Sequence, residues 1–408
     1  MKSQFGFVGM KWMKKTFEEV VLFARTGLNP RQNFKLGQGN NNYITIKNIK
    51  NNSLVIDDNT DVVDDEAIKL IHKRSQIKKG DVLFASIGRM GDMFIIEEEP
   101  IGWDINESVF AFTLNTNIVK QKYFYYIFRV KSTLDYLISN SSGSTFKSIK
   151  MNQLKKMVFD IPQLEEQDYI ISVLDKVCDV IEKRKQELEF LDNLIKARFV
   201  EMFGNPVNNE KGFVKAPMGD YMTLLTDFSS NGSYKTLDSG VTMYDEPNYA
   251  WMVRTTDLES GDMTSIKYID ENAYELLAKS KIYGGEIIMN KIGSAGKIYL
   301  MPQIDMPASL GRNAFMFRYD DRINVKFLYH LLTSEYGQRE IQQYVRGAVT
   351  KTITKNDVRA VLIMVPPIEL QNEFEAFVKQ VDKSKVAVQK TLDETKLLFD
   401  SLMQKYFG

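Results

Sequence analysis

The chain has 408 residues, of which 44% are hydrophobic and 26% are charged, and its formal net charge is zero. This composition is typical of a globular protein of two or three domains and counts against a protein that coats nucleic acid, although a local basic face remains compatible with it. The sequence has no 18-residue apolar run, no signal-peptide pattern and no second cysteine to pair with Cys178, which together predict a cytoplasmic protein.

Strand and helix patterns of mixed character occupy the first part of the chain. Period-two alternation and turn residues predict strands, and two of these flank a glycine-bearing loop as in a hairpin. A helical pattern follows them. The predicted strands are 43–46, 82–87, 93–96 and 109–114, the loop is 86–92, and the helix is 122–137.

An unbroken stretch without Gly or Pro follows Ile161-Pro-Gln-Leu-Glu-Glu-Gln167 and runs to Phe203. A proline just before a helix suits its missing N–H, and acidic residues in the first turn suit the helix dipole. Gly204 and Pro206 end the pattern. We therefore predict one long helix between two mixed domains.

The second half of the chain repeats the first with a shift of 204 or 205 residues. Phe203-Gly204 aligns with Phe407-Gly408, and Ile77–Gly91 aligns with Ile282–Gly296. The period is too long for a solenoid, so it indicates duplicated domains with two similar surfaces, which a two-fold partner such as duplex DNA would fit. In the second copy, strands are predicted at 287–290, 298–300 and 314–317, a helix at 325–334, and a long helix after Val365-Pro-Pro-Ile-Glu-Leu-Gln371.

Both long helices carry a heptad pattern, and it favours an antiparallel coiled coil between them. Several positions are polar in one helix where the other is apolar, which disfavours self-pairing. Packing of each helix on its own domain by a 3.6-residue stripe is the alternative. Such a helix pair would span roughly 50 Å and separate two recognition surfaces by about one to one and a half turns of B-DNA. The aligned positions are Val177, Ile181, Arg184, Leu188, Leu191, Ile195, Arg198 and Met202 in the first helix, and Val381, Lys385, Val388, Leu392, Thr395, Phe399, Leu402 and Tyr406 in the second.

The sequence carries no motif that indicates a catalytic site. His72 and His330 are not at equivalent repeat positions and have no neighbouring Cys or His, which argues against a zinc site. The sequence has no P-loop and no G-x-S-x-G elbow. Val365-Pro-Pro-Ile368 lacks the polar first residue and aromatic fourth residue of an amino-methyltransferase motif. We therefore predict a chain without catalytic or metal-binding residues.

Several loops of the sequence have the composition of a nucleic-acid-binding surface. Loops 86–92 and 291–297 combine glycine with basic residues, which suits contacts to phosphate, although ordinary hairpin loops would look the same. Loops 141–150 and 346–355 add hydroxyl groups and fit DNA backbone contacts, helix caps, or both. Stretch 38–48 carries amides suited to adenine edges, or is a solvated loop. The candidate DNA-binding residues are Asn48, Arg89, Ser144, Thr145, Lys147, Lys150, Arg254, Lys291, Lys297, Arg346, Thr350, Lys351 and Lys355.

The repeated segments Ile161–Ile171 and Val365–Phe374 each follow a Gly-Ser-Thr or Gly-Ala-Val loop and each open a long helix. In this the chain resembles the specificity subunit of type I restriction-modification enzymes, over its whole length apart from the stretch before Trp12. The resemblance implies an α+β fold in which two target-recognition domains each read half of a split DNA site, with the paired helices as spacer and docking surface. The implied boundaries are domains at 1–160 and 205–364, and helices at 161–204 and 365–408.

The resemblance also implies that this chain has no catalytic centre and no cofactor. Two modification subunits would transfer a methyl group from S-adenosylmethionine to adenine, and restriction subunits would use ATP and Mg to translocate and cleave double-stranded DNA. No membrane partner is implied. Two alternatives compete with this prediction: a fused methyltransferase-specificity protein, and a coiled-coil interaction scaffold without nucleic acid, which the zero net charge favours.

Overall fold

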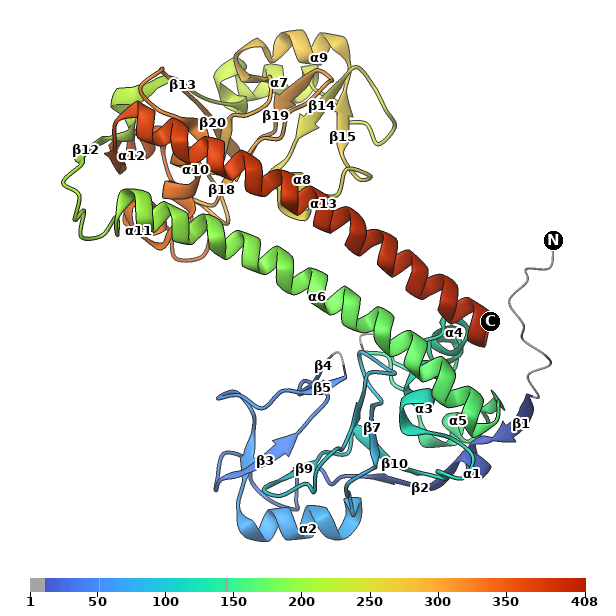
Figure 1. Ribbon diagram of the computed structural model, residues 1–408. Coiled ribbons are helices and arrows are strands. Elements are labelled where there is room, and N and C mark those ends of the chain that lie inside the picture. The colour runs from blue at the N-terminus through green and yellow to red at the C-terminus, as the bar shows by residue number, and fades with distance from the viewer. Residues whose placement is uncertain (1–11, 51, 144–145) are drawn as a thin grey trace. The chain divides into compact units, whose positions relative to one another are not determined.

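The computed structural model describes residues 12–50, 52–143 and 146–408 (Figure 1). It divides into two compact units. Unit 1 holds the described residues up to Arg184 together with Thr391–Gly408, and unit 2 is Lys185–Lys390. Each unit therefore contains part of both long helices, α6 (Leu164–Phe203) and α13 (Ile368–Phe407).

Unit 1 is built on an antiparallel sheet with strand order β2-β10-β7-β8. A second sheet, β6-β3-β9, contains the parallel pair β3 and β9. The strands are β1 (Met13–Thr16), β2 (Val21–Thr26), β3 (Asn41–Ile44), β4 (Ile49–Lys50), β5 (Ser53–Leu54), β6 (Val62–Val63), β7 (Val82–Ala85), β8 (Met93–Ile95), β9 (Trp103–Ile105), β10 (Val109–Leu114) and β11 (Val158–Ile161). The helices are α1 (Phe17–Val20), α2 (Asp65–Ser75), α3 (Gln121–Ile127), α4 (Lys131–Ser139) and α5 (Met151–Leu154).

Unit 2 repeats this topology. Its antiparallel sheet has the order β13-β20-β17-β18, and its second sheet contains the parallel pair β14 and β19. The strands are β12 (Val214–Pro217), β13 (Met222–Asp227), β14 (Ala250–Val253), β15 (Lys267–Ile269), β16 (Lys281–Ile282), β17 (Ile287–Asn290), β18 (Ile298–Leu300), β19 (Ala308–Leu310), β20 (Ala314–Tyr319) and β21 (Leu362–Val365). The helices are η1 (Met218–Tyr221), η2 (Phe228–Asn231), α7 (Tyr234–Gly240), α8 (Thr255–Ser260), α9 (Glu271–Leu276), η3 (Ala278–Ser280), α10 (Val325–Thr333), α11 (Glu335–Gln342) and α12 (Lys355–Ala360). The prediction of two tandem α+β repeats, each followed by a long helix, is confirmed.

The helix predicted over 122–137 is wrong as a single element, because the structure has α3 and α4 there. Val130 has extended backbone angles, with φ −73° and ψ 138°, and begins α4. The residues from Tyr123 to Ile127 are all buried, which no single face of one long helix allows. The break lets α3 lie inside the core while α4 turns out to its surface.

The far end of each long helix completes the core of the other repeat. In unit 1, Met403 and Tyr406 of α13 pack in the same core as Ile170 and Leu174 of α6. In unit 2, Phe199 of α6 stacks on Phe327 of α10, with ring centroids 5.7 Å apart, and meets Phe374 of α13 edge-on at 5.4 Å. Neither core is therefore closed by its own repeat alone.

Heptad positions face inward in both helices, as predicted. Every position of the aligned heptads is buried or half-buried. In unit 2, the polar mismatches become ion pairs: Lys385 lies 2.5 Å from Asp192, and Arg198 lies 3.3 Å from Glu373. Because the partner numbers rise along α13 as they fall along α6, these segments run antiparallel, and the coiled-coil prediction is confirmed.

The glutamine repeated in the two helix-start motifs has one structural role. Gln167 accepts a hydrogen bond from the Lys120 backbone N–H at 2.9 Å and donates to the carbonyls of Ile118 and Pro162 at 2.8 and 2.9 Å. Gln371 bonds in the same way to the backbone of Asn324, Arg322 and Pro366. Both side chains are fully buried, so this amide fastens the first turn of each long helix to its domain.

Candidate nucleic-acid interface

In the first repeat, the structure joins two loops that the sequence predicts separately. Strand β7 ends in loop 86–92, and loop 141–150 leads into α5. The Gly88 N–H donates to the Lys147 carbonyl at 3.0 Å, and the Ile149 N–H donates to the Ser86 carbonyl at 2.9 Å. The two loops therefore form one surface at one end of the central sheet.

The second repeat joins its loops by the same bonds. The Gly293 N–H donates to the Lys351 carbonyl at 2.9 Å, and the Ile353 N–H donates to the Lys291 carbonyl at 3.1 Å. The paired loops are therefore a property of the repeat. We call 86–92 with 141–150, and 291–297 with 346–355, the paired-loop surfaces.

Each paired-loop surface contains two residues that are joined by a pair of backbone hydrogen bonds. Ser142 and Ser148 exchange two backbone hydrogen bonds, as do Arg346 and Thr352. Gly347 lies between the latter pair with a φ of 108°, and a Cβ there would come within 2.2 Å of the Thr350 carbonyl oxygen. Only glycine fits such a position without strain. Gly143 occupies the equivalent position with a φ of 110°.

The first paired-loop surface presents unpaired positive charge. Lys147 and Lys150 are exposed, and neither forms an ion pair within the described residues. Arg89 donates a hydrogen bond to the Ile49 carbonyl at 2.9 Å and lies 3.3 Å from the Asp92 carboxylate, but its side chain is 54% exposed. Ser144 and Thr145 lie outside the described residues.

The second paired-loop surface is built around a buried carboxylate. Lys291 and Lys355, one from each loop, both donate to Asp227 at 2.8 Å. Burial raises the pKa of Asp227, but hydrogen bonds from Lys291, Lys355 and Ser230 outweigh it and hold the pKa at about 2. Two lysines on one carboxylate leave a net positive charge at neutral pH, and they tie both loops to the end of β13.

Two further predicted bases of the second repeat, Lys297 and Arg346, also have carboxylate partners. Arg346 lies 2.9 Å from Asp357 while 73% exposed, and Lys297 lies 2.5 Å from Glu259 while 46% exposed. Thr350 and Lys351 are exposed at the turn. Part of the charge is thus neutralised within the fold, while the nitrogen atoms of the exposed side chains remain accessible to a phosphate.

These paired surfaces lie within the segments that match a known family. Residues 10–190 and 220–395 each match the family model described as the type I restriction modification DNA specificity domain. The chain belongs to the type I restriction-modification specificity family. The resemblance noted in the sequence is thereby confirmed.

Relatives of this specificity protein come from archaea and bacteria. The type I restriction enzyme MjaIX specificity subunit of Methanocaldococcus jannaschii is 26% identical over 306 residues, covering 70% of this chain and 68% of the relative. The EcoBI specificity subunit of Escherichia coli is 22% identical over 327 residues, covering 74% and 68%. The crystal structure of the type I restriction-modification S subunit from M. genitalium superposes with a TM-score of 0.53 at 15% identity, covering 100% of this chain and 99% of that one. At that identity, the structural likeness concerns the fold alone.

Two predicted residues of the specificity domains are instead engaged in holding loops. The amide oxygen of Asn48 accepts from the N–H and hydroxyl of Thr45, and its nitrogen donates to Val55 and Thr60, so no hydrogen-bonding group is left for a base. Arg254 is bound by Asp257, at 3.2 and 2.5 Å, and by the Ser265 carbonyl.

Asn48 and Asp257 have the same role in the two repeats. Asn48 follows β3 and accepts from the Thr45 N–H at 2.9 Å, and Asp257 follows β14 and accepts from the Arg254 N–H at 3.1 Å. Each is buried and fixes the turn after a strand of the parallel pair. The Asn48 side chain therefore serves to hold this turn.

Sequence reasoning missed the residues that position the predicted bases. Asp227 and Asp357 lie outside the predicted loops. Asp227 binds Lys355, which is distant in the sequence, and Asp357 binds Arg346 across the turn of its loop. A carboxylate at the end of a strand was a signal for Asp227, and the capping-box spacing from Thr354 was a signal for Asp357. Among the described residues, no group of three or more His, Cys, Asp or Glu side chains is placed to hold a metal ion. No helix in the described part of the chain is long and apolar enough to cross a bilayer.

Proposed function

We propose that this chain is the DNA-reading subunit of a type I restriction-modification complex and carries no catalytic group of its own. Each repeat would hold one half of a bipartite, gapped site on double-stranded DNA. The observation that carries this proposal is the paired-loop surface, which is built by equivalent backbone bonds in both repeats and presents Lys147, Lys150 and Lys351. A surface with glycine-containing turns and exposed lysines suits contacts to the phosphates of the DNA backbone.

The two repeats differ where a difference would matter for sequence recognition. The bonding of the loops is shared, but the side chains are not: the residue before the short helix is the exposed Lys150 in the first repeat and Thr354, which caps α12, in the second. Shared backbone with divergent side chains supports two half-sites of different sequence.

The chemistry would belong to partners. In this proposal two modification subunits methylate adenine with S-adenosylmethionine, and restriction subunits use ATP and Mg, all in the cytoplasm. The long helices also carry exposed apolar side chains, of the kind that a docked subunit would cover. Phe190 and Val386 in unit 2 are 64% and 71% exposed, and Leu397 in unit 1 is 70% exposed.

Salt-dependent binding tests this proposal. We expect the complex of this chain with modification subunits to bind duplex DNA with an affinity that falls steeply between about 50 and 200 mM salt. Lys147→Ala should lower the slope of log affinity against log salt by about one, because one phosphate contact is lost. Lys69→Ala, an exposed lysine on α2, is the matched control and should leave the slope unchanged. Absent or salt-independent binding would favour the interaction scaffold.

A further inference from the structure

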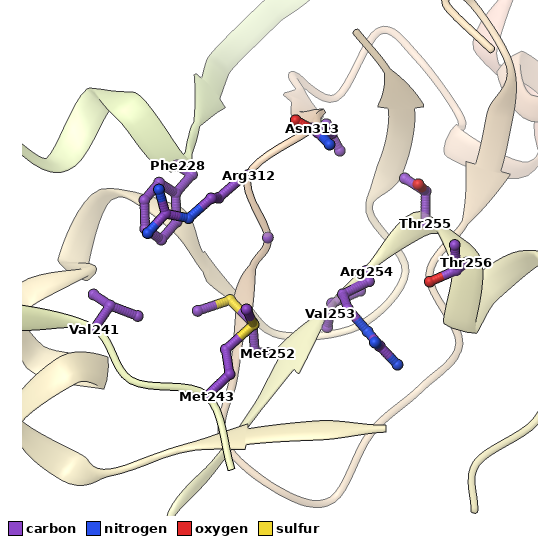
Figure 2. A pocket seen from close by; sticks show the side chains of 12 residues that line it. Phe228, Val241, Met243, Met252, Val253, Arg254, Thr255, Thr256, Arg312 and Asn313 are labelled. Atoms are coloured by element: carbon purple, nitrogen blue, oxygen red, sulfur yellow. The ribbon is translucent and has the colours of Figure 1, made fainter. Parts of the chain in front are cut away.

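Unit 2 contains a cavity that the paired-loop surface does not explain. It has a volume of about 380 Å³ and opens where β14 and β19 end, beside residues 254–256 and 311–313, which follow the two strands (Figure 2). These two strands are parallel, with Val253 opposite Leu310. In open parallel sheets the carboxyl ends of the strands are where ligands bind, and this parallel pair presents the same kind of edge.

The floor of the cavity is apolar. Phe228, Val241 and Met252 are buried, whereas Met243 is 50% exposed at the mouth. Figure 2 shows Met243 and Met252 side by side, with Val241 on the same wall. Methionine side chains adapt their shape to an apolar ligand.

The rim of the cavity is polar and includes Arg312 and Asn313. The Arg312 guanidinium lies over the Phe228 ring, 4.9 Å from its centroid, and 3.2 Å from Asp238. The Asn313 side chain is exposed and makes no hydrogen bond within the described residues. Figure 2 shows Arg254 extending away from this group, in agreement with its bonds to Asp257.

The cavity is fastened to the paired-loop surface. The Lys291 N–H donates to the Asn313 carbonyl at 2.9 Å. Phe228 directly follows Asp227, the carboxylate that holds Lys291 and Lys355. A duplex whose backbone lies on these loops would therefore bring its base edges to the mouth of the cavity.

We propose that this cavity reads a T·A base pair of the second half-site through its major-groove edge, an inference that rests on the proposed function. The thymine methyl group enters the mouth beside Met243. Asn313 pairs with the N6 and N7 atoms of the adenine, which is the pairing that its amide geometry favours. Arg312 forms one wall, held in place by Phe228 and Asp238.

The first part of the test uses adenine methylation mapping with the partner modification subunits present. The second half-site must contain a T·A pair, and Asn313→Ala should relax that position alone by roughly ten- to a hundredfold. Arg312→Ala should weaken readout at the same half-site. Arg322→Ala is the matched control, because Arg322 pairs with Asp320 and lies over Tyr221 beyond the opposite end of β20.

The second part removes only the methyl group, in binding assays with uracil in place of single thymines. We expect one uracil in the second half-site to weaken binding by the unmodified complex about fourfold, the value of one buried methyl. Met243→Ala should bring this ratio close to one. Met263→Ala, which is equally 50% exposed but outside the cavity, should leave the ratio unchanged.

The outcomes separate the two proposals. A complex that binds no specific DNA contradicts the proposed function. Specific binding with a second half-site that lacks thymine, or with a uracil effect that Met243→Ala leaves intact, overturns the cavity inference alone. A rise in 2-aminopurine fluorescence on binding, at the position read by Asn313, would show an extrahelical base and would also overturn it.

Discussion

Single residues in this molecule show that a repeated sequence position can have a structural cause, a functional cause or both. Gln167 and Gln371 recur because a buried amide closes the start of each long helix. Gly143 and Gly347 recur because the turn of the paired-loop surface allows no Cβ. Asn48 and Asp257 occupy one structural role with different side chains, which sequence alignment at a fixed shift does not reveal.

The buried glutamine predicts a specific loss of stability. Gln371→Leu keeps the volume but leaves the Asn324 N–H and two carbonyls without a partner. We expect the free energy of unfolding of unit 2 to fall by about 3 kcal/mol or more, because three groups lose their partner and each buried unpaired group costs about 1–3 kcal/mol. Denaturant unfolding measures this, with Gln343→Leu on an exposed position as control. An unchanged midpoint would mean that the motif does not fasten the helix.

Asp227 predicts a pH dependence of unit 2. Its folded pKa of about 2 lies below the ordinary value of 3.8, so its ionised form stabilises the fold above about pH 4. This contribution, about 2 kcal/mol, is lost as the pH falls through 2. Asp227→Asn should remove that part of the acid destabilisation in denaturant titrations between pH 5 and 2. Asp245→Asn, whose side chain is 84% exposed, is the control; equal acid sensitivity of both variants would contradict the assignment.

At the scale of elements, local patterns and distant contacts explain which predictions held. Local hydrophobic periodicity is enough to predict the long helices and the strands near 82–85, 109–114 and 287–290. The break between α3 and α4 arises because the core takes up every residue from Tyr123 to Ile127, which no local pattern reports. Each loop could be predicted from its own residues. The hydrogen bonds that pair the loops join residues far apart in the chain, so the pairing could not be predicted.

The exchange of helix ends predicts where a core substitution acts. Phe199→Ala, on α6, should lower the free energy of unfolding of unit 2 by about 3–5 kcal/mol, since its ring packs on Phe327 and Phe374. Phe190→Ala lies on the same helix and is 64% exposed, so it should change stability by less than about 0.5 kcal/mol. Hydrogen exchange would locate the loss. Unchanged protection in α10 of the Phe199→Ala variant would contradict a shared core.

At the scale of the whole molecule, the chain is two copies of one specificity domain that share their helices. Duplication explains why the loop surfaces are built alike, and divergence of their side chains explains how two copies could read different sequences. Composition gave little guidance, because the basic residues of the second repeat are largely balanced by carboxylates such as Asp227 and Asp357. The charge that matters is local, and a net charge of zero conceals it.

The most direct test of this account is adenine methylation mapping of DNA in cells that hold the modification subunits, with and without this chain. The account predicts a motif that appears only with the chain and consists of two different half-sites separated by a fixed gap of about 5–10 base pairs. Asn313→Ala should alter one half and leave the other intact. A methylation pattern that is the same with and without the chain, in cells where the complex assembles, would contradict the claim that this chain chooses the site.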